Sequence, residues 1–144
     1  MTAKISYDDV EAGTELPAQS FPVSRATLVR YAGASGDFNP IHWNEKFAKE
    51  VGLPDVIAHG MFTMAEAIRV VTDWTGDPGA VAEYGVRFTK PVIVPNDETG
   101  ALIEVSAKVA AKLDDEARTV RVDLTATSAG QKVLGMSRAV VRLA

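Results

Sequence analysis

Two side chains in one short segment have the chemistry of an acid/base pair. Asp37 and His42 lie five residues apart in the sequence, and the turn between them contains Asn39 and Pro40. A histidine can titrate near neutral pH, and a carboxyl group that is screened from water can keep a proton long enough to donate it. Taken alone, an Asp-x-Asn-Pro turn is more often structural. The combination with His42 favours a site for proton transfer, because two residues at this spacing in a turn can converge.

The acid/base pair is predicted to lie in a loop between two short helices. Ser24 is a good N-cap for a helix over residues 24–34, which has apolar residues at helical spacing. Glycines and the turn before Pro40 end that helix, because glycine permits sharp reversals and proline favours extended geometry in the residue before it. Asn44 can cap a second short helix that runs to about Val51.

A longer helix is predicted over residues 60–74. Its apolar side chains surround most of the helix axis, and Glu66, Arg69 and Asp73 form one narrow charged stripe. This pattern predicts a helix that is enclosed on most sides. At about 1.5 Å per residue the helix has the length of a neighbouring strand, so a sheet can lie along it.

Beyond residue 79 the apolar residues alternate with a period of two, as they do in half-buried strands. Strands are predicted over residues 83–88, 103–112, 120–126 and about 132–143, with hairpin turns at 114–116 and 129–130. Together with an N-terminal strand, they predict an α+β protein in which one antiparallel sheet wraps around the long central helix, the hot-dog layout. A chain of 144 residues is long enough for one such core, so residues 1–144 are predicted to form a single domain.

The last predicted strand is apolar on both of its faces. One face is expected to carry Leu134, Met136 and Val140, and the other Ala139, Val141 and Leu143. An apolar outer face of this kind predicts contact with a second subunit, and hence a dimer.

The composition argues against several classes of protein. A net charge of −4 leaves no basic footprint for nucleic acid. The absence of cysteine removes disulfides, thiolate metal sites and a cysteine nucleophile. Residues 1–11 lack the pattern of a signal peptide, and no stretch reaches the roughly 18 apolar residues of a membrane helix. A cytoplasmic protein without membrane contact is therefore predicted.

No cofactor and no metal are predicted. His59, the other histidine, stands 17 residues from His42 without further clustered ligands, and its place before the long helix suggests a capping or packing role. The sequence has no Gly-rich motif of the kind that binds the phosphates of a nucleotide cofactor. Its serines also lack the neighbouring base and acid that a serine hydrolase needs. An acidic thiol carrier would need a local basic rim, for which the candidates are Arg30, Lys46, Lys49, Arg87 and Lys90.

The segment from Tyr31 to His42, followed by Ala48, resembles the signature of the MaoC-like, or (R)-specific enoyl thioester hydratase, family. Further stretches are similar to the catalytic subunits of actinobacterial (3R)-hydroxyacyl-acyl carrier protein dehydratases of type II fatty acid synthesis. These stretches run from Ala58 to Met61, Gly76 to Gly79, Tyr84 to Phe88 and Val94 to Asp97. The resemblance covers nearly the whole chain.

The resemblance implies a hydro-lyase that converts (3R)-3-hydroxyacyl thioesters to trans-2-enoyl thioesters, on an acyl carrier protein in fatty acid elongation. His42 would take the proton from C2, and Asp37 would help to protonate the departing hydroxyl group, although which group handles which proton stays open. Gly60, at the start of the long helix, is the candidate donor to the enolate oxygen, because its backbone N–H is unpaired and it has no side chain. Asn39 is expected to close the turn.

Several alternatives stay open at this point. The same pair would serve an (R)-specific enoyl-CoA hydratase of fatty acid breakdown, so the net direction, the acyl chain length and the carrier, acyl carrier protein or coenzyme A, are undecided. A hot-dog thioesterase would share the fold but would release the thiol. A non-catalytic acyl-binding subunit would need neither Asp37 nor His42. The resemblance is compatible with a homodimer or with a heterodimer in which a related hot-dog subunit supplies the acyl tunnel.

Overall fold

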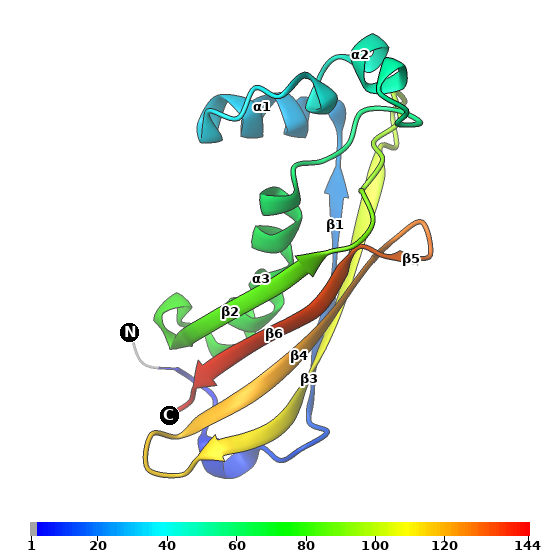
Figure 1. The fold of residues 1–144 in the computed structure, drawn as a ribbon. Coiled ribbons are helices and arrows are strands. Elements are labelled where there is room, and N and C mark those ends of the chain that lie inside the picture. The colour runs from blue at the N-terminus through cyan, green and yellow to red at the C-terminus, as the bar shows by residue number, and fades with distance from the viewer. Residues whose placement is uncertain (1–2) are drawn as a thin grey trace.

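The strands form one antiparallel sheet that curves past a long helix (Figure 1). The computed structural model describes residues 3–144. Its strands are β1 (Glu15–Val23), β2 (Val81–Phe88), β3 (Ala101–Asp114), β4 (Thr119–Ser128), β5 (Gln131–Lys132) and β6 (Leu134–Arg142). They lie in the order β1-β3-β4-β6-β2, and the short β5 pairs with β4. The predicted α+β class and hot-dog layout are confirmed.

Helices α1 (Arg25–Ser35) and α2 (Glu45–Glu50) lie at one end of the sheet, and α3 (Gly60–Thr75) runs along one side of it (Figure 1). The short 3-10 helices are η1 (Tyr7–Asp9), η2 (Pro40–His42) and η3 (Pro78–Ala80). Within residues 3–144, none of these helices has both the length and the apolar character that crossing a membrane requires.

Local capping determines where α1 and α2 begin. Ser24 Oγ accepts a hydrogen bond from the Thr27 N–H at 3.1 Å, and Thr27 Oγ1 accepts one from the Ser24 N–H at 3.2 Å. At the start of α2, the side chain of Asn44 accepts a hydrogen bond from the Phe47 N–H at 3.0 Å. Both predicted helices are therefore confirmed, with nearly the predicted bounds.

One side of α3 packs against the sheet and forms the core. Ala67, Val70 and Val71 are at most 1% exposed, and they meet inward-facing strand residues such as Ile103. The opposite side of α3 is open in the single chain, where Met61 is 59% exposed. The exposed residues of α3 form a single stripe on that side, and all its other residues are buried or half-buried, so the prediction of a helix enclosed on most sides is confirmed; the stripe consists of Met61, Ala65, Arg69 and Asp73.

The last predicted strand is broken at one residue and carries a bulge at another. Val133 separates β5 from β6, and Met136 has a φ of +46° where the pairing of β6 with β2 changes register. Leu134 is 1% exposed whereas Met136 is 58% exposed, so these two residues do not share a face as predicted. Beyond this bulge Ala139 and Val141 again point into the core.

Candidate active site

Short-range hydrogen bonds shape the loop that carries Asp37. Helix α1 ends at Gly36, whose φ of +76° lies in the left-handed region. The Asp37 N–H then donates to Ser35 Oγ at 3.2 Å, and the Asn39 N–H donates to Asp37 Oδ1 at 3.1 Å. Asn39 Oδ1 accepts a hydrogen bond from the Ile41 N–H at 3.3 Å, which confirms that Asn39 closes the turn.

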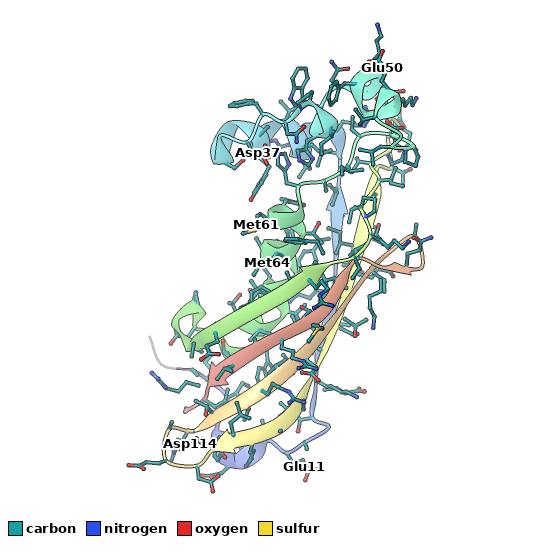
Figure 2. The ribbon with its side chains drawn as sticks, in the orientation of Figure 1. Glu11, Asp37, Glu50, Met61, Met64 and Asp114 are labelled. Carbon is teal, nitrogen blue, oxygen red and sulfur yellow. The ribbon has the colours of Figure 1, made fainter. Side chains whose placement is uncertain are left out.

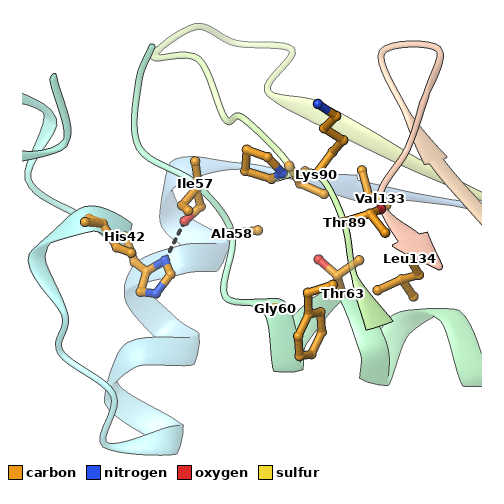
Figure 3. A pocket seen from close by; sticks show the side chains of 13 residues that line it. His42, Ile57, Ala58, Gly60, Thr63, Thr89, Lys90, Val133 and Leu134 are labelled. Carbon is orange, nitrogen blue, oxygen red and sulfur yellow. Dashed lines mark hydrogen bonds between the residues drawn. The ribbon is translucent and has the colours of Figure 1, made fainter. Parts of the chain in front are cut away.

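His42 lies in η2, and one hydrogen bond orients its buried ring (Figure 3). Its Nδ1 is 2.7 Å from the carbonyl oxygen of Ile57. Because a carbonyl oxygen can only accept, Nδ1 carries the proton and Nε2 keeps a free lone pair. Burial lowers the pKa of His42 below its ordinary 6.5; the ring of His59 adds to this effect, while the Ile57 hydrogen bond and Asp37 oppose it. The lowered pKa therefore favours the neutral form of the His42 ring at neutral pH.

The fold brings Asp37 and His42 together, as their spacing predicted. One potential ligand atom of each of Asp37, His42 and His59 lies within 4.8 Å of the other two. The environment of the carboxyl group differs from the expectation, since the Asp37 side chain is 53% exposed in the single chain. The chain by itself therefore does not screen this carboxyl group from water.

His59 also belongs to this cluster, which its position in the sequence did not indicate. It is the N-cap residue of α3 but makes no side-chain capping bond, so the predicted capping role is wrong. Its side chain is 2% exposed. The ring stacks on that of His42, with centroids 3.7 Å apart and planes at 21°. Its Nε2 lies 3.0 Å from the carbonyl oxygen of Asp37.

The cluster is poorly arranged for a metal ion, although its ligand atoms are close enough to share one. The lone pairs of imidazole nitrogens lie in the ring plane, so two stacked, nearly parallel rings direct them side by side rather than at a common point. This geometry favours proton transfer over metal binding.

Two cavities meet at the start of α3. The first, of about 350 Å³, is lined by His42 and by mostly apolar residues (Figure 3). The second, of about 410 Å³, is lined by Asp37 and His59. Gly60 and Phe88 line both cavities. Asp37 and His42 therefore open onto adjoining spaces.

Gly60 is the first residue of α3, as predicted. The N–H groups of a first helical turn have no partner within their helix, and they lie at the positive end of the helix dipole. A Cβ atom at Gly60 would lie 3.0–3.3 Å from ring atoms of Phe88. The missing side chain thus leaves room for an aromatic ring beside the helix start. The role of Gly60 as a donor to an oxyanion stays a prediction.

The predicted basic rim is not gathered around the site. Lys90 lines the first cavity, whereas Arg87 lines a separate hollow on the sheet. Lys46 and Lys49 form ion pairs within α2, and Arg30 is exposed on α1. Lys90 is therefore the basic residue, among these five, that lies at the site.

The chain is similar to known proteins, either over about half of its length or over nearly all of it. The chain is 47% identical over 79 residues to 3-hydroxyacyl-thioester dehydratase X of Mycobacterium tuberculosis, which covers 55% of this chain and 27% of that protein. It is 32% identical over 139 residues to 3-hydroxybutyryl-CoA dehydratase of Methylorubrum extorquens, which covers 95% of this chain and 83% of that protein. A solved MaoC-like dehydratase superposes with a TM-score of 0.94 at 47% identity, covering 99% of this chain and 43% of that one.

The chain spans less than half the length of two of these three proteins. Its own sequence matches the family described as MaoC like domain over residues 9–128. This match includes the Asp37 loop, His42 and all of α3. The family that the sequence motif resembled is confirmed, and the chain belongs to the MaoC-like domain family.

Proposed function

We propose that this chain is a hydro-lyase that interconverts (3R)-3-hydroxyacyl thioesters and trans-2-enoyl thioesters. The observation that carries the proposal is the free Nε2 lone pair of buried His42 in a cluster with the Asp37 carboxyl group, beside a mostly apolar cavity. The names of the two relatives, a 3-hydroxyacyl-thioester dehydratase and a 3-hydroxybutyryl-CoA dehydratase, support this class of reaction.

In dehydration, His42 Nε2 takes the proton from C2, and the electrons of that C–H bond pass to the thioester carbonyl to form an enolate. The enolate then forms the C2–C3 double bond and expels the 3-hydroxyl group, which leaves as water with a proton from Asp37. The backbone N–H of Gly60 stabilises the enolate oxygen at the positive end of α3. Solvent exchange returns His42 and Asp37 to their starting states, and hydration reverses these steps.

The acyl chain occupies the first cavity, and its carrier is an acyl carrier protein, as in fatty acid elongation, or coenzyme A. The mostly apolar lining of this cavity suits a hydrocarbon chain. Lys90 in the same lining can meet the negative charge of either carrier. The cytoplasmic location predicted from the sequence stays a prediction.

The active unit is a pair of hot-dog chains, either two copies of this chain or this chain with a related subunit. Asp37, Met61 and Met64 follow one another along one side of the molecule (Figure 2). On this side the Asp37 side chain is 53% exposed and Met61 is 59% exposed. A second chain over this face would screen the carboxyl group from water, which an acid role of Asp37 requires.

The test follows the ultraviolet absorbance of the conjugated enoyl thioester, with free thiol measured in parallel. Crotonyl and longer enoyl groups are offered on both carriers to the wild type, Asp37→Asn and His42→Ala. We expect enoyl loss without thiol release, reduced roughly 10²- to 10⁴-fold in each folded variant. Thiol release would indicate a thioesterase. No turnover, even with a co-purified partner, would indicate a non-catalytic acyl-binding subunit.

A further inference from the structure

His59 is a buried polar residue that the proposed reaction does not use. Its side chain is 2% exposed, and its Nδ1 has no hydrogen-bond partner among the residues described, 3–144. Leaving a buried nitrogen without a partner costs free energy, so an apolar side chain would fill the same space at lower cost. The presence of a histidine here therefore calls for a function beyond packing.

One contact of His59 holds the loop that carries Asp37. Its Nε2 lies 3.0 Å from the Asp37 carbonyl oxygen, which can only accept, so Nε2 carries the proton and donates it. This bond joins residues 22 positions apart and connects the loop after α1 to the start of α3. The other hydrogen bonds of the Asp37 loop are short-range, so they shape the loop without fixing its position on the fold.

A second contact of His59 holds the ring of His42. The two rings stack with centroids 3.7 Å apart, and the edge of Tyr31 packs against His59 from α1, with centroids 4.7 Å apart and an interplanar angle of 60°. The stack fixes the plane in which the His42 Nε2 lone pair points, while the Ile57 bond fixes rotation within that plane. His59 therefore contacts both the backbone of Asp37, at its carbonyl oxygen, and the ring of His42.

We propose that His59 is a positioning residue that clamps the Asp37 loop to the ring of His42 and so sets the separation of the acid and the base. The inference rests on the proposed function for its effect on catalysis. His59 does not act on substrate itself, because its Nε2 is committed to the Asp37 carbonyl oxygen and its Nδ1 is buried. Its nearness also contributes to the lowered pKa of His42.

Two substitutions separate the contacts of His59. His59→Phe keeps an aromatic ring beside His42 but loses the N–H donor, and His59→Gln keeps a donor but loses the ring. Thr75→Val is the matched control, because Thr75 is equally buried at the other end of α3, about 24 Å away along the helix. It removes the hydroxyl group that donates to the carbonyl oxygen of Thr72 or of Asp77 and that accepts a hydrogen bond from the Asp77 N–H.

The steady-state kinetics, the amide exchange of Asn39 and the titration of the His42 ring are measured for each variant, with all samples folded to the same extent. For His59→Phe we expect kcat to fall about 10- to 100-fold with little change in KM, because the acid and base are misplaced. Amide exchange of Asn39, whose N–H bonds to Asp37, should quicken in the same variant. In His59→Gln, the amide of Asn39 should still exchange slowly. The His42 ring should titrate at higher pH in this variant, because the neighbouring ring that lowers its pKa is gone. The other titratable groups around His42 are Asp37, Tyr31 and Lys90.

Thr75→Val should lose stability but keep kcat and the exchange rate of Asn39. Unchanged exchange and unchanged kcat in folded His59→Phe would overturn the clamp, as would equal losses of kcat in Thr75→Val. Exchange and ring titration need no turnover. If the wild type does not hydrate enoyl thioesters, the proposed function is wrong. Amide exchange and ring titration would still show whether His59 clamps the Asp37 loop to His42.

Discussion

His42 can act as a base because its surroundings keep it neutral and aim its free nitrogen. The Nδ1 proton is held by the Ile57 carbonyl oxygen at 2.7 Å, which leaves Nε2 unprotonated. Burial is the largest cause of its lowered pKa, since an imidazolium ion would lose solvation in this site. Burial therefore keeps the ring of His42 neutral, and so able to accept a proton, over a wider range of pH than in water.

The acid limb of the pH profile tests this state of His42. In the proposed reaction the neutral ring of His42 is the base, and its lowered pKa means that more of the ring is neutral at pH 6.5 than in an ordinary histidine. We therefore expect kcat/KM for enoyl hydration to reach half of its plateau value at a pH below 6.5. NMR titration of the ring in the same buffer identifies the group, and a midpoint well above 6.5 would contradict the prediction.

Adding a single methyl group at Gly60 should lower activity while leaving the stability of the fold nearly unchanged. In Gly60→Ala the new Cβ would crowd Phe88, which is 52% exposed and can move aside, so we expect the free energy of unfolding to change by less than about 1 kcal/mol. Activity should fall roughly 10- to 100-fold, because the methyl group and the displaced ring disturb the approach of the carbonyl group to the helix N-terminus. Gly33→Ala is the control, since its Cβ would meet nothing within 4 Å.

At the scale of elements, one side chain ties together the segments that surround the site. Arg25, at the start of α1, donates from Nε to the carbonyl oxygen of Val94 at 2.6 Å. Its guanidinium also pairs with Asp55 at 2.6 Å and with Glu45 of α2 at 3.4 Å. Asp55 precedes the stretch that supplies Ile57, so Arg25 joins α1, α2 and the chain that orients His42.

Arg25→Met should loosen this end of the molecule. The Arg25 and Asp55 side chains are 23% and 19% exposed, so their bonds are only partly screened, and we expect a loss of about 1–3 kcal/mol in the free energy of unfolding. Urea titration measures the loss. Lys46→Ala, which breaks a pair whose side chains are 86% and 60% exposed, should leave the urea midpoint unchanged. Equal effects of the two substitutions would contradict a clamping role for Arg25.

At the scale of the whole molecule, two surfaces compete as the contact face for a second chain. The outer face of β6 alternates Met136 and Val140 with Arg138 and Arg142, so it is only half apolar. The face along α3 carries exposed Met61 close to the uncovered Asp37 carboxyl group (Figure 2). We favour the face along α3 as the contact, because a second chain over it would also screen the Asp37 carboxyl group from water.

Light scattering distinguishes these two faces. The wild type, or its complex with a related subunit, should have the mass of two chains rather than the 15.4 kDa of one. Met61→Glu should return it to one chain and abolish activity, without harm to folding, because an acidic residue suits the first turn of a helix. Met136→Glu should keep the mass of two chains; the opposite pattern would move the contact to β6.

Features with a local cause followed from the sequence. The caps of α1 and α2 depend on Ser24 and Asn44 and on residues three positions away, and the strands follow from alternation within single segments. Asp37 and His42 could be paired for the same reason, since one turn brings them together. The bulge at Met136 was missed because its left-handed backbone is imposed by pairing with β2.

The tertiary structure alone decided how the site is held and how far it is exposed. His59 lies 17 residues from His42, so their stacking depends on how the start of α3 packs against η2, which no local pattern encodes. The orientation of His42 likewise depends on a carbonyl oxygen 15 residues away. The sequence determined which groups can do the chemistry, because this is a property of side chains, whereas packing between distant segments determined their tautomer, their separation and their exposure to water.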